Sequence, residues 1–276
     1  MKKIISLALA VLTLALVLAA PVSAAPGKGS YGDVPMFKGG IEMDGKIDEA
    51  YTEFGLKIGT QDYGANYKSD TKCDLYLLHD GEYLYVIYDV KEAYDFKPDK
   101  YLEANKNASG AWKLCGTELH VDWAGKGVDC AKLMIIATGE FWGSRMADKK
   151  EATYVKEIKT SYDVAAKTYV LEIKMPFVDG AKVGGTIGFF PMITSNNDFA
   201  NPGQNHILCT KTDAPAANKA AEFYNVTLSD EEVAFPEAPK EEAKAPATSA
   251  KTFDGLAVLA VVAALSGAGV VVSKKR

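Results

Sequence analysis

The middle of the chain is a succession of short strand-like runs separated by turn signals. Apolar and polar residues alternate in residues 73–77, and the aromatic and β-branched run 83–90 follows after a turn at Asp80-Gly81. Two such runs around an Asp-Gly turn predict a β-hairpin. Further strands are predicted at 117–123, 130–137, 152–160, 168–175, 186–194 and 222–228.

Helical signal between the two ends of the chain is limited to short pieces such as residues 47–51. No apolar repeat of 3.6 residues holds there over three turns. Many short strands with little helix predict an all-β domain, an antiparallel β-sandwich of two packed sheets.

The two ends of the chain are apolar and predict export and attachment to a membrane. Lys2-Lys3, an apolar run and the small residues Val22-Ser23-Ala24 predict a signal peptide over residues 1–24. Residues 253–273 are long and apolar enough for one C-terminal transmembrane helix. The cationic residues 274–276 then form the cytoplasmic tail, which places the rest of the chain outside the cell.

Between these segments the sequence divides into one domain and a linker. Residues 25–228 hold the predicted strands, whereas residues 229–252 are rich in Pro, Ala, Glu and Lys. A segment of that composition buries too little apolar surface to offset its ordering entropy. We therefore expect a β-sandwich domain over 25–228 and a disordered stalk over 229–252.

Charge and cysteine spacing exclude several classes of function. The chain carries a formal net charge of −5, and its end segments hold Lys2, Lys3, Lys274, Lys275 and Arg276, so the exported part is more acidic still. An acidic surface repels polyanions, which argues against nucleic acid as a partner. The four cysteines form no Cys-x-x-Cys pair, and their disulfide pattern stays open.

Five sequence blocks together resemble the family 9 carbohydrate-binding modules. They are residues 43–51 (MDGKIDEAY), 80–86 (DGEYLYV), 118–122 (ELHVD), 169–176 with 185–189 (YVLEIKMP and GTIGF), and the looser polar block 194–198. The resemblance spans most of the exported part. It implies a non-catalytic β-sandwich that binds a polysaccharide or oligosaccharide.

The resemblance also implies a binding site. In such modules a sugar ring packs between two tryptophans while carboxylates and amides bind its hydroxyl groups. Trp112 falls where the family has one tryptophan, and Glu118, six residues later, falls on its sugar-binding carboxylate. Along the predicted strand Glu118, His120 and Asp122 share one face, which is either a sugar site or a merely solvated face. The candidate carbohydrate-binding residues are Trp112, Glu118, His120, Asp122, Asn197 and Asp198.

The second tryptophan of the family is missing, because no tryptophan occurs after Trp142. Either Phe199, Trp142 or another aromatic residue takes its place, or the sugar site has been lost or repurposed. A glycosidase is not expected, since Glu118 and Asp122 lie roughly 13 Å apart along a strand, beyond the reach of paired carboxylates.

Two alternative functions remain. One is a haem-binding redox sandwich with Met134, Met192 and His120 as ligands; the other is a structural or adhesive surface protein with no sugar site. No cofactor is expected, although the acidic turns 95–99 and 196–198 make calcium a candidate structural ion. We expect carbohydrate binding at a bacterial cell surface, accessory to polysaccharide capture or degradation, with membrane attachment through the C-terminal helix.

Overall fold

The structure is a computed structural model that describes residues 27–59, 70–93, 114–145, 154–195, 206–208 and 219–236. The predicted signal peptide, the predicted transmembrane helix and the stalk beyond residue 236 lie outside these ranges. None of the helices in the described part is long and apolar enough to span a membrane.

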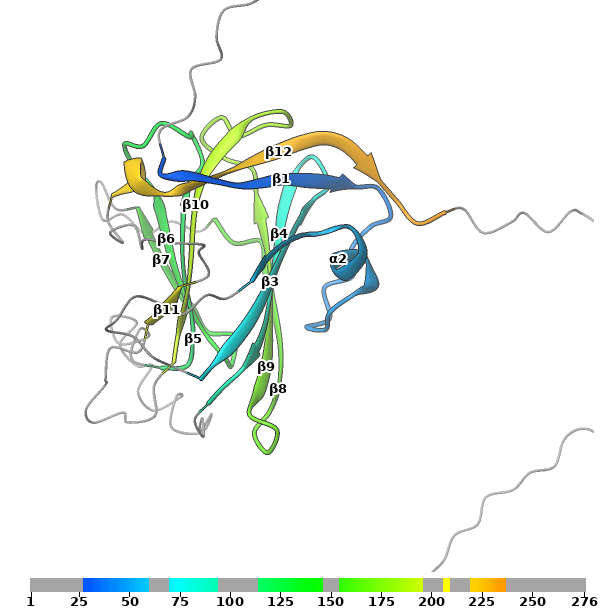
Figure 1. Cartoon of the computed structure of the whole chain (residues 1–276), viewed down its shortest axis with the longest axis vertical. Coiled ribbons are helices and arrows are strands. Elements are labelled where there is room, and N and C mark those ends of the chain that lie inside the picture. Colours follow the sequence, from blue (N-terminus) through cyan, green and yellow to red (C-terminus); the bar gives the residue numbers. More distant parts are fainter. Residues whose placement is uncertain are drawn as a thin grey trace, which may run out of the picture. The chain divides into compact units, whose positions relative to one another are not determined.

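The described part of the chain forms strands almost throughout (Figure 1). The helices are α2 (Glu49–Phe54) and the short 3-10 helix η2 (Ala220–Glu222). The strands are β1 (Gly29–Phe37), β2 (Leu56–Gly59), β3 (Lys72–His79), β4 (Tyr83–Lys91), β5 (Gly116–Asp122), β6 (Ala131–Ile136), β7 (Phe141–Arg145), β8 (Glu157–Asp163), β9 (Thr168–Pro176), β10 (Thr186–Thr194), β11 (His206–Leu208) and β12 (Tyr224–Val233).

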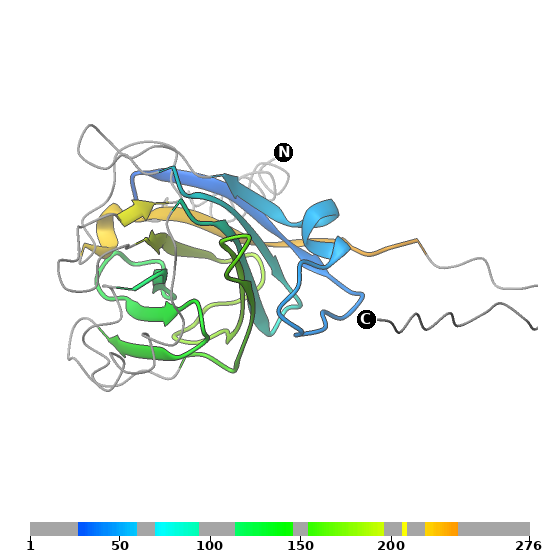
Figure 2. The ribbon, with the colours of Figure 1, turned by 90° about the horizontal axis from the view of Figure 1, so that it is seen from below.

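These strands form one continuous hydrogen-bonded sheet in the order β7-β6-β5-β10-β12-β1-β3-β4-β9-β8, with β11 on β10 and β2 on β3. The sheet curves so that strands β5, β6, β7 and β10, here the β5 half, face strands β3, β4, β8 and β9, here the β4 half (Figures 1 and 2). The fold is thus sheet-rich and sandwich-like, as predicted.

The prediction of two separate antiparallel sheets is wrong in one respect. Strand β1 pairs in parallel with both β12 and β3, and so joins the two halves. Its sequence includes Gly29, Gly32 and Pro35, and its register shifts between Val34 and Met36. Because Pro cannot donate a ladder hydrogen bond, it is tolerated at such an irregularity. The strand lacks regular apolar alternation, so it was not predicted.

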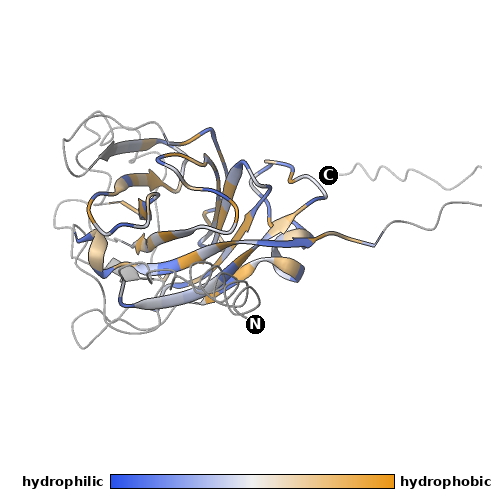
Figure 3. Cartoon of the chain, turned by 90° about the horizontal axis from the view of Figure 1, so that it is seen from above, coloured by the Kyte–Doolittle hydropathy of each residue, from blue (hydrophilic) through white to orange (hydrophobic). Residues whose placement is uncertain are grey.

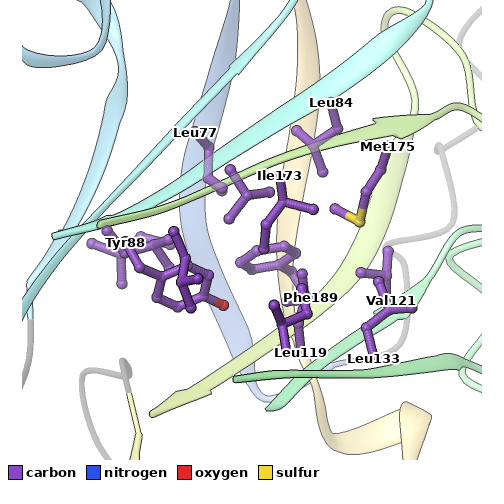
Figure 4. Packing of buried hydrophobic residues seen from close by; sticks show 14 of the residues in the cluster. Leu77, Leu84, Tyr88, Leu119, Val121, Leu133, Ile173, Met175 and Phe189 are labelled. Atoms are coloured by element: carbon purple, nitrogen blue, oxygen red, sulfur yellow. The ribbon is translucent and has the colours of Figure 1, made fainter. Parts of the chain in front are cut away.

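The core lies between the two halves. Hydrophobic residues lie along the strands of both halves (Figure 3), and every second residue of a strand points to the same face, so each half turns an apolar face inward. The side chains that meet there have no solvent exposure (Figure 4). They include Leu77, Leu84, Tyr88, Ile173 and Met175 from the β4 half and Leu119, Val121, Leu133 and Phe189 from the β5 half.

The predicted β3–β4 hairpin is confirmed, and hydrogen bonds from the Asp80 side chain stabilise its turn. Oδ1 of Asp80 accepts hydrogen bonds from the backbone N–H groups of Glu82 at 2.8 Å and Tyr83 at 2.7 Å. Gly81 has a φ of +96°, in a region that favours glycine. The Asp-Gly pair therefore sets the register of the two strands.

The predicted end of the domain at residue 228 is too early, because β12 continues to Val233. Met36 pairs with Glu232 and Phe37 with Val233, and the Nε2–H of His79 donates to the carbonyl of Ser229 at 2.9 Å. Backbone pairing needs no apolar side chains, so a polar segment can extend a strand. The part of the predicted stalk from residue 229 to residue 233 therefore belongs to the sheet.

The outer face of the β4 half is closed by α2 and by the turn before it. The carboxylate of Glu172 on β9 is fully buried and accepts hydrogen bonds from the N–H groups of Asp44 and Gly45 and from the Tyr51 hydroxyl, at 3.0–3.1 Å. Gly45 has a φ of +76°, and a Cβ there would lie 2.9 Å from the backbone of Thr160. These contacts give residues 43–51 and 169–176 a structural role.

Candidate functional site

The outer face of the β5 half carries the predicted polar row. Glu118, His120 and Asp122 alternate along β5 with the core residues Leu119 and Val121, as the period of two predicts. Glu118 is 4% exposed, His120 0% and Asp122 3%. The row is buried, so the alternative of a merely solvated sheet face is wrong.

Register places further side chains on this face, because directly opposed residues of neighbouring strands point the same way. Glu118 lies between Met134 on β6 and Met192 on β10. His120 lies between Lys132 on β6 and Phe190 on β10. Sequence reasoning missed Lys132, although pairing the predicted strands 117–123 and 130–137 across their turn would have placed it here.

Glu118 is held by two neighbours. Its Oε1 accepts hydrogen bonds from the Lys132 ammonium at 2.6 Å and from His120 Nε2 at 2.9 Å. Burial alone would raise the pKa of Glu118, but the His120 hydrogen bond and the Lys132 charge outweigh it and lower the pKa to about 2. The carboxylate is therefore ionised at neutral pH.

His120 fixes the geometry of that carboxylate. Its ring packs against Phe190 and Phe223, with centroids 5.5 Å and 5.8 Å away. Burial lowers the pKa of His120 even though Glu118 opposes this, so the ring is neutral at neutral pH. Because a carboxylate oxygen only accepts, the proton lies on Nε2, and Nδ1 is a buried acceptor with no hydrogen-bond partner.

The surroundings of the pair are apolar and aromatic. Phe190, Met192 and Phe223 pack together with Cys130 and Ala220 in one buried cluster. Met134 on β6 lies directly opposite Glu118 on one side and opposite Trp142 of β7 on the other. Trp142 is therefore on the same face of the sheet as Glu118, two strands away from it. At about 4.8 Å per strand this is roughly 10 Å. Trp142 is partly buried and packs against core residues.

Asp122 has a different role from Glu118. Its carboxylate accepts a hydrogen bond from the Gly127 N–H at 2.6 Å, and other N–H groups of the same turn also lower its pKa. Burial is the larger influence, and the net effect raises the pKa of Asp122. The carboxylate organises the β5–β6 turn and lies roughly 13 Å along the strand from Glu118. The structure thus separates these two candidate residues.

The remaining candidate residues, Trp112, Asn197 and Asp198, lie outside the described residues, as does Phe199. The described chain nearest to them ends at Leu114 before β5 and at Ser195 after β10. Gly116 pairs with Thr194, so both ends emerge from the same end of the β5 half. The roles of these residues remain predictions.

The buried carboxyl group of Glu92, which sequence reasoning missed, lies at the same end of the β5 half as Gly116 and Thr194. Glu92 accepts hydrogen bonds from the hydroxyls of Thr71 at 2.9 Å, Ser195 at 2.5 Å and Tyr169 at 3.3 Å. Burial raises the pKa of Glu92 more than these donors lower it. The cluster ties the start of β3 and the ends of β4 and β10 together.

The described residues give no support to the hypotheses of a metal site or a haem site. Within them no group of three His, Cys, Asp or Glu side chains could hold a metal ion. The acidic turns predicted for calcium, 95–99 and 196–198, lie outside these ranges. Met134 and Met192 flank Glu118 as its cross-strand partners, and His120 Nε2 is bound to Glu118 rather than available to iron.

Comparison with known proteins assigns the family. Residues 43–231 match the model of the family described as "Carbohydrate family 9 binding domain-like", which covers more than half of the chain. The chain therefore belongs to this family, a family of non-catalytic carbohydrate-binding modules. No protein with a curated description matches the chain.

Two solved structures are similar in fold. One is a family 9 carbohydrate-binding module from Caldicellulosiruptor kristjanssonii in complex with cellotriose, at 16% identity and a TM-score of 0.56. The match covers 71% of this chain and 93% of that one. The other is a family 9 module from the same organism in complex with glucose, at 15% identity and a TM-score of 0.56, covering 71% and 95% of the two chains.

Proposed function

We propose that the outer face of the β5 half binds the end of a polysaccharide or an oligosaccharide, with Glu118 as the central hydroxyl acceptor. The observation that carries this proposal is an ionised, buried carboxylate held by Lys132 and by a neutral histidine on a family 9 fold. A carboxylate has about four lone-pair sites, so Glu118 can accept hydroxyl groups while it keeps both neighbours.

The neighbouring groups suit a neutral sugar. Lys132 can donate to ring or hydroxyl oxygens, and His120 holds the Glu118 carboxylate in place through its Nε2. The apolar C–H face of a pyranose packs well on an aromatic ring. We assign Trp112 as one such wall and Trp142 as the candidate for the second, with Asn197 and Asp198 as further polar contacts.

A β-linked glucose chain is the first ligand to test, because the similar modules were crystallised with cellotriose and with glucose. We further propose that the chain is exported, that residues 253–273 hold it in the membrane and that residues 237–252 keep the domain away from the surface. Many tethered copies would engage one polymer together, so even a millimolar site contributes to capture.

Isothermal titration of the full-length chain with cellotriose, glucose and xylan tests the proposal. We expect saturable binding to at least one of them. Trp112→Ala and Glu118→Gln should each weaken it about tenfold or more, because the first removes an aromatic wall and the second a charged hydroxyl acceptor. Glu231→Gln, an exposed change on β12, is the matched control and should bind as the parent does. Equal binding by Glu118→Gln and the parent would contradict the assignment.

A further inference from the structure

The buried carboxyl of Glu92 links the two halves of the sheet at the end where β5 begins and β10 ends. Glu92 directly follows β4 and is 3% exposed. Its Oε2 accepts a hydrogen bond from Thr71 Oγ1, just before β3, at 2.9 Å and another from Ser195 Oγ, just after β10, at 2.5 Å. One carboxylate oxygen is therefore shared between the β4 half and the β5 half.

Two further groups connect Glu92 to the start of β5. The hydroxyl of Tyr169 on β9 lies 3.3 Å from Glu92 Oε1 and also 3.3 Å from the carbonyl oxygen of Gly116, so it bridges the two. Burial raises the pKa of Glu92, and the fully buried thiol of Cys115 is one of the donors that lower it. Glu92 thus holds the start of β5 as well as the end of β10.

The start of β5 is tightly packed and lies close to Glu118. Gly116 pairs with Thr194 on β10, and a Cβ on Gly116 would collide with the carbonyl oxygen of Ile135 on β6. The next pair on the same face is Glu118 with Met192, roughly 7 Å further along the ladder at about 3.3 Å per residue. A shift at the start of β5 therefore carries Glu118 with it.

Two of the assigned sugar contacts outside the described residues are joined to the same anchor points. Trp112 precedes Cys115 by three residues, and Asn197 follows Ser195 by two. A chain spans at most about 3.6 Å per residue, so the Cα atom of Trp112 lies within about 11 Å of that of Cys115, and that of Asn197 within about 7 Å of that of Ser195. The placement of Cys115 and Ser195 therefore limits where these side chains can meet a sugar.

The contacts of Glu92 do not depend on its charge. The groups that face it are neutral at physiological pH, namely the hydroxyls of Thr71, Ser195 and Tyr169 and the thiol of Cys115. Thr71 Oγ1 and Ser195 Oγ lie 3.0 Å apart, and each can donate or accept. A protonated carboxyl, or a glutamine amide in its place, therefore donates into the same network.

We propose that Glu92 is a positioning residue for the sugar site, which sets the start of β5 and the end of β10 so that Glu118, Trp112 and Asn197 are in place before a sugar binds. Groups that must be ordered during binding lower the affinity, and groups that are already ordered do not. The inference rests on the function proposed above and adds a residue that does not touch the sugar.

Titration calorimetry of the full-length chain with cellotriose tests this role. Glu92→Ala should weaken binding about tenfold, because both strand ends lose their shared anchor. Glu92→Gln should stay within about twofold of the parent, since the amide both donates and accepts. Glu172→Ala is the matched control, because it also removes a buried carboxyl with three donors but on the outer face of the β4 half. Parent affinity in Glu92→Ala, or an equal loss in Glu172→Ala, would overturn the proposal.

A milder pair of variants covers the case in which Glu92→Ala does not fold. Ser195→Ala removes one hydroxyl from the Glu92 network and should weaken cellotriose binding several-fold. Ser161→Ala removes the hydroxyl that donates to the carbonyl of Gly45 at 2.7 Å in the β4 half, and should bind as the parent does. Equal affinities of the two serine variants would count against Glu92 as a positioning residue.

Nuclear magnetic resonance of ¹⁵N-labelled indoles gives a readout without sugar. The chain has three tryptophans, and Trp112→Phe identifies the Nε1–H signal of Trp112. This signal should shift in Glu92→Ala and stay in place in Glu172→Ala, and an unmoved signal in Glu92→Ala refutes the positioning role by itself. A parent that binds neither cellotriose, glucose nor xylan refutes instead the function on which the proposal rests.

Discussion

Each half of the folded sheet carries one buried glutamate on its outer face, Glu172 on β9 and Glu118 on β5, and the two are held in different ways. Glu172 accepts only from neutral donors of its own domain, the N–H groups of Asp44 and Gly45 and the hydroxyl of Tyr51. Glu118 is bound by the Lys132 ammonium and by His120.

The electrostatic consequences are opposite. Burial raises the pKa of Glu172 above its ordinary value despite three donors, whereas His120 and Lys132 together outweigh burial at Glu118 and lower its pKa to about 2. The Glu172 donors come from a turn and a helix that cover it, and Glu118 sits beside a histidine whose Nδ1 has no partner. The comparison separates a carboxylate that fastens a loop from one that we propose binds a ligand.

The largest expected effect is on stability at Glu172. Glu172→Ala leaves two N–H groups and one hydroxyl without their buried acceptor, at about 1–3 kcal/mol each. We expect urea unfolding of the full-length chain to show a loss of about 3 kcal/mol or more, with cellotriose binding retained by the folded fraction. Glu231→Ala serves as the exposed control. An unchanged midpoint would show that Glu172 does not fasten residues 43–51.

A smaller effect is expected on pH dependence at Lys132. In the parent, Glu118 is ionised well above its pKa of about 2, so cellotriose affinity should be flat between about pH 5 and pH 8. Lys132→Met removes one of the two groups that lower this pKa, the other being His120, so the pKa of Glu118 rises from about 2. Affinity of the variant should fall several-fold as the pH drops through that raised value, because the protonated carboxyl loses acceptor capacity.

Titration calorimetry at several pH values measures this, with the exposed Lys159→Met as the matched control. A flat profile in Lys132→Met would contradict the role given to Lys132. A parent profile that changes near pH 6.5 would show instead that His120 titrates normally, contrary to the neutral ring inferred above.

Much of this fold follows from local pattern. Strands β3, β4, β5, β6, β9 and β10 were predicted to within a residue or two, because each is a short run rich in apolar, aromatic or β-branched residues between turn signals. Strands β1, β2, β7 and β11 were missed, and β8 and β12 begin or end up to five residues from their predicted bounds. Glycine and proline interrupt β1, and β2, β7 and β11 are too short to show a period, so tertiary pairing makes them strands.

The candidate site on the outer face of the β5 half was predictable only in part, because local sequence pattern does not give cross-strand contacts. The period of two placed Glu118, His120 and Asp122 on one face. It could not show that Asp122 serves the turn at Gly127 or that Lys132 reaches Glu118, because both depend on the cross-strand register and on the turn geometry. The burial of the row depends on packing that no local pattern encodes.

A crystal structure of the full-length chain with cellotriose tests the central claim most directly. We expect a sugar hydroxyl within about 3 Å of the Glu118 carboxylate, with the Lys132 and His120 contacts kept and an aromatic ring against the sugar face. Cellotriose bound elsewhere on the domain, with the outer face of the β5 half unoccupied, would contradict the account.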